Sequence, residues 1–426
     1  MATSLFTTLK GLKGNARGVV LTEALWGIPF NLYAPYVSVY MLALGLDDKK
    51  IGLIASLGLV GQILSAILGG AITDKFGRKR TTLIADLFSW SVPCLIWAIS
   101  QNFTYFVIAA LINSTWRISM VSWGCLLVED TDPKQLVEIY TWIYIAGTLS
   151  VFFAPLAGVL INAYSLVPTQ RALYAFAFVM MTAKFVTMNR MVKETRQGMV
   201  RMSETRGQSL FQLLGEYHGV FRQILAARQT LYTIGIMMIM SAAQLVNNTF
   251  WSILVTQRLH IPAQHIAYYP FARSLIMLVF FFLVTPRVRD MHFRNPMLVG
   301  LAGFITSQAL LITMPEKSYL LLLLSTLIDA CSYAAVGTQL DRMLVVTVDP
   351  EERARIVAII YVMVIAVTSP FGWIAGELSS ISKVLPFALN IVLFAAAAIL
   401  VLRAAQYSKK QSALALENPL RPVEEL

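Results

Sequence analysis

Twelve long apolar stretches separated by polar intervals most limit how this 426-residue chain can fold. A helix rises ~1.5 Å per residue, so about 20 apolar residues cross a hydrocarbon layer ~30 Å thick. Because lipid offers no partners to backbone N–H and C=O groups, such stretches must form helices. We expect membrane helices at residues 18–44, 49–73, 81–100, 103–127, 137–163, 169–190, 229–255, 265–285, 295–314, 318–340, 354–378 and 383–404.

The composition agrees with an integral membrane protein. Hydrophobic residues make up 57% of the chain and charged residues 13%, against roughly 25% charged residues in soluble domains. There are too few polar side chains to cover a surface that faces water. The N-terminal stretch MATSLFTTLKGLKGNARG leads into the first apolar segment without a small-residue cleavage site. We therefore expect a retained amphipathic helix there and not a signal peptide.

The placement of the cations predicts the orientation. If the N-terminus is cytoplasmic, 25 of the 34 Lys and Arg residues lie in the cytoplasmic tails and loops. This excess is the positive-inside rule, and it places both termini in the cytoplasm of a multi-pass cell (plasma or inner) membrane protein. A nucleic-acid-binding protein would gather its cations on one face. The net charge of +11 therefore indicates orientation in a lipid bilayer and no nucleic-acid partner.

The sequence predicts no metal, cofactor or enzymatic centre. Cys94, Cys125 and Cys331 all lie inside apolar segments and lack metal-ligand spacing. The four histidines lie in loops or at segment edges. No His/Cys/Asp cluster falls at a common membrane depth, as a membrane-embedded enzyme would need. A Gly-x-x-x-x-Gly-Lys-Ser/Thr phosphate loop is also missing, so we expect no ATP-driven pump.

The loop GGAITDKFGRKR, residues 69–80, carries the most specific motif. It places one acid, one glycine and four cations between the second and third apolar segments. The pattern Gly-x-x-x-Asp-Lys-x-Gly-Arg-Lys resembles the loop signature of the major facilitator superfamily. Its matching residues are Gly70, Asp74, Lys75, Gly77, Arg78 and Lys79. The family often has a further cation at the place of Thr81, and here Arg80 supplies that charge one residue earlier.

The resemblance implies an all-α membrane fold of twelve transmembrane helices in two pseudo-symmetric six-helix bundles. We expect bundles at 1–190 and 229–404, a cytoplasmic linker at 191–228 and a cytoplasmic tail at 405–426. The linker's second part, around residues 210–225, has helical apolar spacing and predicts an amphipathic helix on the membrane surface. Its first part fits a solvated connector. A monomer is the usual form in this family.

An internal repeat supports the two bundles. TDPKQLVEIYTWIY precedes the fifth segment and VDPEERARIVAIIY precedes the eleventh, with Asp-Pro equally far from a tyrosine in both. Further along, Pro155 is opposite Pro370. Parallel six-helix repeats leave this kind of weak similarity at half the chain length.

Several residues are candidates for gating. Asp74 ends the second segment, and Gly77 supplies the tight turn that follows. In the resembling family the acid caps a helix of the opposite bundle, here the eleventh, and latches the cytoplasmic side shut. Pro155 and Gly158 resemble, imperfectly, the antiporter motif of the fifth helix. The predicted gating set is Gly70, Asp74, Gly77, Arg78, Arg80, Pro155, Gly158 and Pro370.

Ionisable residues inside apolar segments are functional candidates, because burying a charge in lipid is costly. Glu23 lies in the first segment and Arg117 in the fourth, and both helices line the central cavity in the resembling fold. We expect the two side chains to approach each other, with Glu23 as the proton carrier. In the second half, Asp329 and Arg273 are candidates for a counterpart pair. A static pair that only fixes helix packing remains open for each.

Amide and aromatic side chains predict the substrate site. Aromatic faces and amides that line a cavity suit small amphipathic organic molecules, although aromatic belts also mark membrane interfaces. The candidates are Trp26, Asn31, Tyr36, Asn113, Gln244, Asn247, Trp251 and Tyr333.

These observations predict a secondary active transporter that works by alternating access. The first hypothesis is proton-coupled efflux of small amphipathic compounds. An alternative is uptake of a small nutrient by proton symport or facilitated diffusion. A membrane receptor that binds solute without moving it would have a similar sequence.

Overall fold

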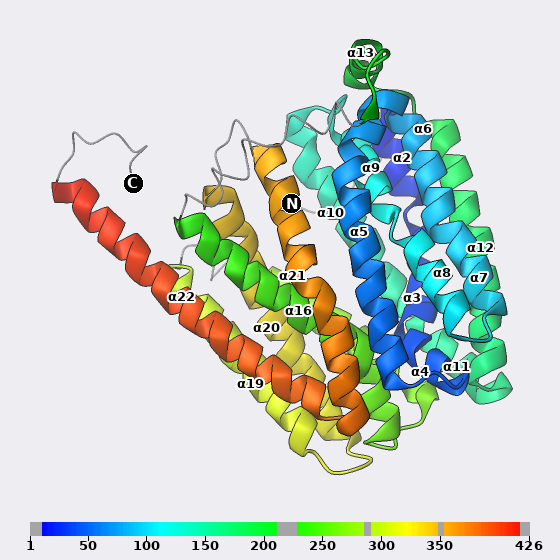
Figure 1. Ribbon diagram of the computed structural model, residues 1–426, viewed down its shortest axis with the longest axis vertical. Helices are drawn as coiled ribbons and strands as arrows, with labels where there is room; N and C mark the ends of the chain where they lie inside the picture. Colours follow the sequence, from blue (N-terminus) through cyan, green and yellow to red (C-terminus); the bar gives the residue numbers. More distant parts are fainter. Residues whose placement is uncertain (1–10, 211–227, 285–290, 348–352, 418–426) are drawn as a thin grey trace.

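The chain folds into helices arranged as two groups that lie side by side (Figure 1). The computed structural model describes residues 11–210, 228–284, 291–347 and 353–417, and it contains no strand within those ranges. Helices up to residue 191 form one half, and helices from residue 228 onward form the other.

The first half contains all six expected membrane segments. Its elements are α2 (Gly14–Thr22), α3 (Ala24–Tyr33), η1 (Ala34–Tyr36), α4 (Val37–Ala43), α5 (Asp48–Phe76), α6 (Arg78–Asp86), η2 (Leu87–Ser91), α7 (Val92–Ile99), α8 (Phe103–Asn113), α9 (Trp116–Val128), α10 (Pro133–Ser150), η3 (Val151–Phe153), α11 (Ala154–Tyr164) and α12 (Leu166–Met191). Short helix α13 (Arg196–Glu204) follows, beyond the end of the bundle.

The second half contains the other six. Its elements are α16 (Arg228–Gln257), η5 (Ala263–His265), α17 (Tyr268–Leu283), α19 (Arg294–Thr313), α20 (Tyr319–Thr347), α21 (Arg353–Ile381) and α22 (Leu385–Glu417). Every expected membrane segment is therefore helical where the structure describes it.

Nine helices of the described chain are long and apolar enough to cross a membrane, counting α6–η2–α7 and α10–η3–α11 as one helix each. They correspond to all the expected segments except the first, fourth and eighth. The first segment is divided at Glu23 and η1, and the fourth is divided at Ser114–Thr115. The eighth, α17, has 16 residues. The fold is the predicted all-helical membrane architecture, with irregular helices among its twelve segments.

Proline explains the irregular backbone of the first segment. Pro29 lies inside α3 and Pro35 lies in the single 3-10 turn η1. Each proline lacks the N–H that would bond to the preceding turn, so the helix bends or breaks there. The 3-10 turn thus lies at the centre of the molecule, where Ala34 and Pro35 line the cavity between the halves.

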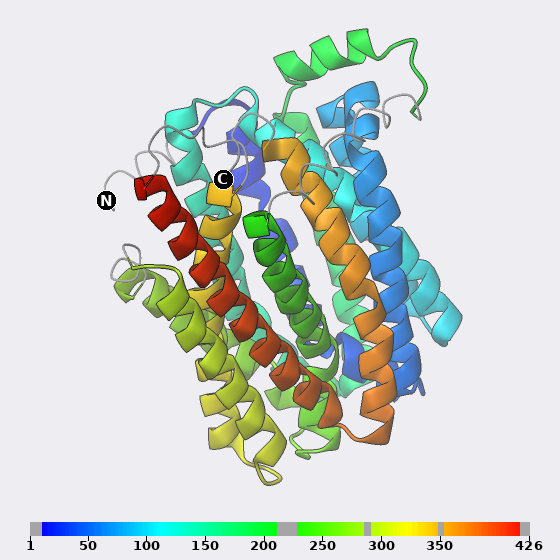
Figure 2. The same cartoon turned by 60° about the vertical axis from the view of Figure 1, so that its left-hand side comes forward.

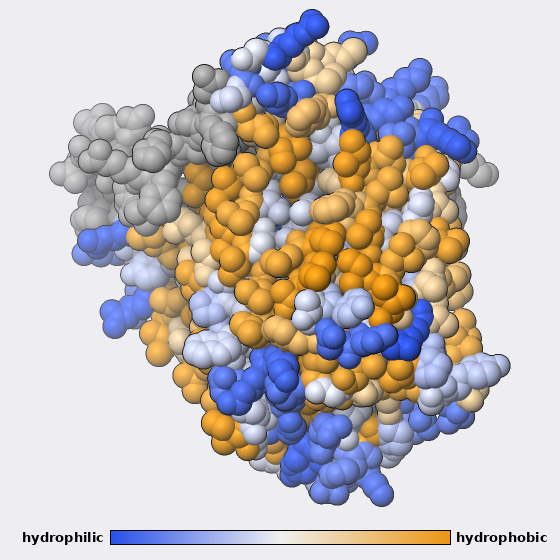
Figure 3. All heavy atoms as spheres, turned by 45° about the vertical axis from the view of Figure 1, so that its right-hand side comes forward, coloured by the Kyte–Doolittle hydropathy of each residue, from blue (hydrophilic) through white to orange (hydrophobic). Residues whose placement is uncertain are grey.

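The outer surface is suited to lipid. Figure 3 shows a broad apolar surface on one face, with polar side chains gathered at the two ends. Exposed side chains of this kind include Leu64 on α5, Val179 on α12 and Val299 on α19. Because lipid tails are as apolar as leucine, the hydrophobic effect gains little by packing these helices together. Close backbone contacts and polar bonds must supply much of the specificity.

The two halves meet most extensively where α5 lies against α21 (Figure 2). At the Asp48 end of α5, a Cβ added at Gly52 would overlap the carbonyl oxygen of Gly372 and the backbone of Gly376. The two helix backbones touch directly there, as small residues allow in membrane proteins. We call the contact of Asp48–Ser56 with residues 372–383 the glycine seam.

Two details differ from the sequence-based expectation. The first part of the linker is not a plain connector, since Arg196–Glu204 forms α13, which begins with an N-cap from Thr195. The Thr195 side chain accepts a hydrogen bond from the backbone N–H of Gly198, and this cap stabilises the start of the helix. Helix α22 also continues to Glu417, well into the expected tail. The predicted amphipathic helix lies almost wholly outside the described residues.

Candidate functional site

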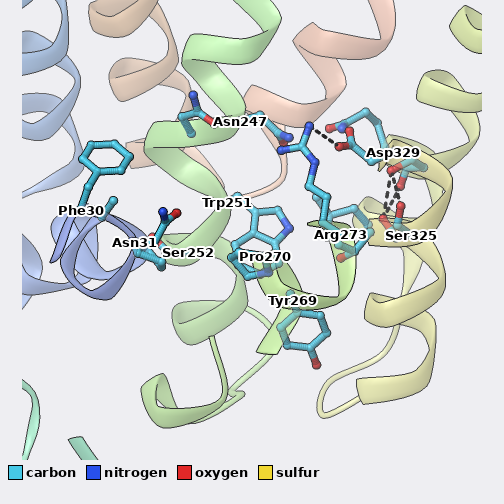
Figure 4. Close-up of a pocket in the computed structure, with 17 residues that line it drawn as sticks. Phe30, Asn31, Asn247, Trp251, Ser252, Tyr269, Pro270, Arg273, Ser325 and Asp329 are labelled. Carbon is cyan, nitrogen blue, oxygen red and sulfur yellow. Dashed lines mark hydrogen bonds and ion pairs between the residues drawn. The ribbon is translucent and has the colours of Figure 1, made fainter. Parts of the chain in front are cut away.

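A cavity of about 440 Å³ lies between the two halves (Figure 4). One wall comes from α3 and η1 of the first half. The other walls come from α16, α17, α19 and α20 of the second half. Its lining residues are Phe30, Asn31, Ala34, Pro35, Asn247, Asn248, Trp251, Ser252, Tyr269, Pro270, Arg273, Ser307, Gln308, Leu311, Ser325, Thr326 and Asp329. The size and mixed lining fit a small organic molecule.

An ion pair occupies one side of this cavity. Arg273 Nη2 lies 3.3 Å from Asp329 Oδ2, which confirms the predicted pairing of the two residues. The guanidinium also lies over the ring of Tyr333, 5.1 Å from its centroid. The Asp329 side chain is 11% exposed and the Arg273 side chain 25%, so both charges border the cavity and are largely removed from solvent.

Several buried polar atoms of the cavity residues have no protein partner. Within the described residues, these are Asn247 Oδ1, Gln308 Oε1 and Arg273 Nε. By contrast, Ser307 and Ser325 bond to each other's backbone carbonyl oxygens, each at 3.0 Å. A buried polar group without a partner costs free energy. A ligand that supplies hydrogen bonds at these three positions would recover it.

The structure gathers only part of the predicted substrate set at this cavity. Asn31, Asn247 and Trp251 line it, and Tyr333 lies behind Arg273. Gln244 donates to Asn248, which itself lines the cavity. The sequence reasoning did not select Ser307, Gln308 and Ser325. Ser325 precedes Asp329 by one helical turn, so helical spacing from the acid was a signal that pointed to it.

Three predicted substrate residues lie elsewhere. Trp26 stacks on Phe30 with ring centroids 4.7 Å apart. Asn113 donates to the carbonyl oxygen of Ser89. Tyr36 is fully buried in the core shared by the two halves. None of these three side chains lines the cavity of Figure 4. They pack or form hydrogen bonds elsewhere inside the protein.

A second buried ion pair lies in the first half, and its partner differs from the expected one. Glu23 accepts a hydrogen bond from Lys184 of α12 at 3.0 Å, and the two side chains are 12% and 7% exposed. The expected approach of Glu23 to Arg117 is therefore wrong. Arg117 instead donates to Gln62 of α5 at 3.1 Å and lies over the Trp116 ring. Lys184 supplies the counter-charge because α12 packs against α2 and α3 on either side of Glu23.

The loop between α5 and α6 forms a compact charged cluster. Gly77 has φ of 82°, a backbone conformation that favours glycine, so the predicted turn is confirmed. Arg78 is 4% exposed and pairs with Asp74 of α5 and Glu129 of α9, each at 3.0 Å. Asp74 also pairs with Arg201 of α13 at 3.0 Å.

The chain that follows α12 completes this cluster. Glu194 accepts hydrogen bonds from the backbone N–H groups of Arg78 and Lys79, both at 3.0 Å. It thereby caps the positive end of α6. Thr195 donates to Glu129. Among the described residues the Asp74 carboxylate pairs with Arg78 and Arg201. Residues 348–352, just before the eleventh helix, lie outside the described part of the chain, so the bond of Asp74 to that helix stays a prediction.

The remaining gating candidates occupy different places. Gly158 lies against the carbonyl oxygen of Gln264, where a Cβ would overlap. Pro155 begins α11 after the 3-10 turn η3. Pro370 lies inside α21, and Ser369 donates to the carbonyl oxygen of Ala366 that the proline leaves without its usual partner. Gly70 is half-buried within α5, and Arg80 is exposed at the start of α6.

The glycine seam adds polar bonds between the halves. Asp48 is buried and accepts hydrogen bonds from Ser379 at 2.6 Å and from Lys383. Ser56 accepts from the backbone N–H of Trp373 at 2.7 Å. Lys49 pairs with Glu377 at 2.7 Å. Contacts of Gly158 with Gln264 and of Phe152 with Phe271 also join the halves.

Comparison with known protein families matches residues 19–337 to the model described as Major Facilitator Superfamily. The chain belongs to the major facilitator superfamily. This confirms the predicted family, whose members are membrane carriers and not enzymes.

Individual relatives of this superfamily member are distant. An uncharacterised MFS-type transporter, YqjV of Bacillus subtilis (strain 168), is 28% identical over 130 residues, which cover 30% of this chain and 32% of the relative. The quinolone resistance protein NorA of Staphylococcus aureus (strain MRSA252) is 28% identical over 106 residues, covering 25% of this chain and 27% of NorA. The chain thus matches about a third or less of the length of these curated relatives.

Solved structures confirm the superfamily fold over nearly the whole chain. A point mutant of the nucleoside transporter NupG aligns with a TM-score of 0.73 and 16% identity, covering 92% of this chain and 100% of NupG. A POT family transporter in complex with 5-aminolevulinic acid aligns with a TM-score of 0.71 and 12% identity, covering 93% and 96%. At these identities the likeness shows the fold alone, and it agrees with a multi-pass membrane protein.

Proposed function

We propose that the protein is a secondary active transporter that exports small amphipathic organic compounds in exchange for protons. The observation that carries the proposal is the cavity of Figure 4, which lies between the halves and beside contacts that close one end of the molecule. Alternating access requires a central site and an end that opens when the halves separate. The glycine seam closes that end in this structure.

The lining supports amphipathic organic substrates. Trp251, Tyr269 and Phe30 offer aromatic faces, which bind varied shapes by stacking and dispersion. Asn31 and Asn247 offer amides for orientation. The relationship to NorA, a protein named for quinolone resistance, is in line with efflux.

Two buried carboxylates support proton coupling. Asp329 borders the cavity and pairs with Arg273. A ligand that binds Arg273 would compete with Asp329 for this cation. Glu23 pairs with Lys184 away from the cavity. A carboxylate removed from water binds a proton more readily, and a nearby cation opposes this. We assign Asp329 with Arg273 the coupling at the substrate site, and Glu23 with Lys184 the carriage of the proton through the first half.

Placement of the termini follows from the cations. The end that carries α13 holds the loop with Lys75, Arg78, Lys79 and Arg80, so we assign it to the cytoplasm. The glycine seam then lies at the outer face, and the structure represents a state closed to the outside.

Uptake of a small nutrient is the second candidate. It is favoured by the buried polar atoms of Asn247, Gln308 and Arg273, which suit a ligand rich in hydrogen-bonding groups. The likeness to a nucleoside transporter and a POT transporter shows the fold alone, so it does not decide between export and uptake.

Flux in proteoliposomes under an imposed pH gradient tests the proposal. A panel of amphipathic compounds is first screened for raising the melting temperature of the purified protein, since ligands that bind the folded state stabilise it. For a ligand found this way, an antiporter accumulates it in the compartment that is acidic. A symporter accumulates it in the opposite compartment when the same gradient is imposed. Binding without flux would assign a receptor.

Variants separate the two carboxylates. Asp329→Asn is expected to abolish accumulation and to weaken ligand binding, because Arg273 loses its partner within the cavity. Glu23→Gln is expected to abolish gradient-driven accumulation while ligand exchange across the membrane continues. Unchanged accumulation by Glu23→Gln would reject its role as proton carrier.

A further inference from the structure

A second cavity, of about 390 Å³, lies in the first half between the end of α5, the start of the α6–η2 helix and α9. It shares no lining residue with the cavity of Figure 4. Phe76, Ile84 and Phe88 line it, and each side chain is about half exposed. Ile118 of α9 lines its deeper part. The chain therefore presents an apolar groove next to the loop of the charged cluster.

The groove runs from the polar end of the molecule into the apolar region. Arg80 lies near the start of α6, beside the end that carries α13. Phe88 lies eight residues further along the same continuous helix, roughly 12 Å deeper at ~1.5 Å per residue. A bound molecule would thus have one end at the depth of lipid headgroups and the other in the hydrocarbon layer.

Two polar groups at the shallow end have no partner among the side chains that the structure describes. Among the residues that the structure describes, no carboxylate lies within ion-pairing distance of Arg80, whereas Arg78 is paired with Asp74 and Glu129. Thr81 is 4% exposed, and its hydroxyl oxygen is buried without a hydrogen bond. Both side chains line the groove. A buried hydroxyl without a partner is costly, so the site is suited to an acceptor from a ligand.

We propose that this groove binds an anionic phospholipid. The phosphate accepts hydrogen bonds from the Arg80 guanidinium and the Thr81 hydroxyl, and one acyl chain lies along Ile84 and Phe88. The unpaired cation favours a lipid with net negative charge, because a zwitterionic headgroup brings a competing cation of its own. The apolar walls favour a lipid over free phosphate, which would leave them without a partner.

The bound lipid would hold the turn between α5 and α6. Arg80 follows Arg78 by two residues, on the helix whose first N–H groups Glu194 caps. A phosphate at Arg80 ties the start of that helix to the membrane surface. The site is independent of the proposed substrate and of the direction of transport.

Lipid binding to the full-length detergent-purified protein tests the proposal. Phosphatidylglycerol and phosphatidylcholine with the same acyl chains are titrated, and binding is followed by native mass spectrometry and by the melting temperature. We expect phosphatidylglycerol to be retained and to raise the melting temperature more than phosphatidylcholine does. Arg80→Gln is expected to weaken phosphatidylglycerol binding about fivefold, and Thr81→Val is expected to weaken it less.

A matched cation serves as the control. Arg190 is exposed in the last turn of α12, at the same end of the bundle, and does not line the groove. Arg190→Gln should leave phosphatidylglycerol binding unchanged. Equal losses in the Arg80 and Arg190 variants would show attraction to the whole basic surface and would overturn the proposal.

A second variant tests the acyl-chain part of the groove. Ile84→Trp keeps Arg80 but fills the groove at an exposed position, so it should reduce phosphatidylglycerol binding without lowering the melting temperature of the lipid-free protein. Glycerol phosphate and inorganic phosphate provide the headgroup chemistry without chains. If either raises the melting temperature as much as phosphatidylglycerol, or if Ile84→Trp binds the lipid normally, the groove is not a lipid site.

Discussion

At its Asp48 end, α5 is bonded to α21 of the other half and to the turn that follows α21. At its Asp74 end, its charges are bonded to α13 and to α6 of its own half. The first set comprises Asp48 with Ser379 and Lys383, and Lys49 with Glu377. The second comprises Asp74 with Arg78 and Arg201. Helix α5 therefore makes polar bonds to the other half at one end, and to α13 and its own half at the other end.

The difference separates contacts that must break during transport from contacts that can persist. If the halves rock about the central cavity, bonds between α5 and α21 at the seam have to open. Bonds within one half move as a unit and need not change. Charge alone does not identify a gate, since both ends of α5 are charged. The identity of the partner helix does.

The largest effect on stability and on labelling from outside is expected from Gly52→Ala. The added methyl group would overlap the carbonyl oxygen of Gly372, so α5 and α21 must move apart. Overpacking of this kind costs about 3 kcal/mol, and it acts on the closed outer end. We expect a lower melting temperature and faster labelling of Ser252→Cys, a cavity position, by an impermeant maleimide added outside. The labelling uses a background in which Cys94, Cys125 and Cys331 are replaced.

The same helix offers a control for this substitution. At Gly58 an added methyl group meets Ala110 at 3.8 Å, which is an ordinary contact. Gly58→Ala should leave stability and labelling close to those of the parent protein. If the two alanine variants behave alike, the seam does not hold the halves together.

A smaller effect is expected from Asp48→Asn. The carboxylate is buried and bonds to Ser379 and Lys383, so the amide would weaken both bonds and leave the Lys383 charge without its partner. Hydrogen bonds to charged groups contribute about 2 kcal/mol. Outer labelling of Ser252→Cys should increase, though less than for Gly52→Ala.

Lys49→Gln is the matched variant for Asp48→Asn. It removes the Lys49–Glu377 pair, whose side chains are 53% and 38% exposed. Exposed pairs contribute little to stability because both charges stay hydrated, so labelling should change little. Equal labelling of the two variants would mean that the buried bonds of Asp48 hold the outer end no more strongly than the exposed Lys49–Glu377 pair does.

Much of the fold follows from the sequence because lipid leaves few alternatives. Apolar stretches long enough to cross a bilayer must be helical, and the expected segments are helical wherever the structure describes them. Gly77 forms the predicted turn because its φ is open to few other residues. The Arg273–Asp329 pair was predictable since two charges in apolar segments of one half need each other.

Contacts between distant helices were not predictable in the same way. Helical spacing shows which face of the first segment carries Glu23, but not that α12 and Lys184 face it in place of Arg117. The glycine seam joins Gly52 to Gly372, far apart in the chain. Gly372 and Gly376 form a Gly-x-x-x-Gly pattern that favours close helix packing, but the pattern does not say which helix packs there. The transport roles of the site residues remain predictions, because geometry alone does not show proton movement.

The smallest effect on stability is expected from Asp74→Asn, and the structural change should be confined to the α13 end of the molecule. Asp74 is 26% exposed and pairs with Arg201, which is 29% exposed, so the pair contributes about 1 kcal/mol or less and weakens with salt. Hydrogen exchange of the α13 amides should become faster, while outer labelling of Ser252→Cys stays unchanged. The control is Glu204→Gln, which removes only the surface pair of Arg201 with Glu204 and keeps Asp74. If Asp74→Asn speeds outer labelling as Asp48→Asn does, the two ends of α5 are coupled, and the distinction between contacts that open and contacts that persist fails.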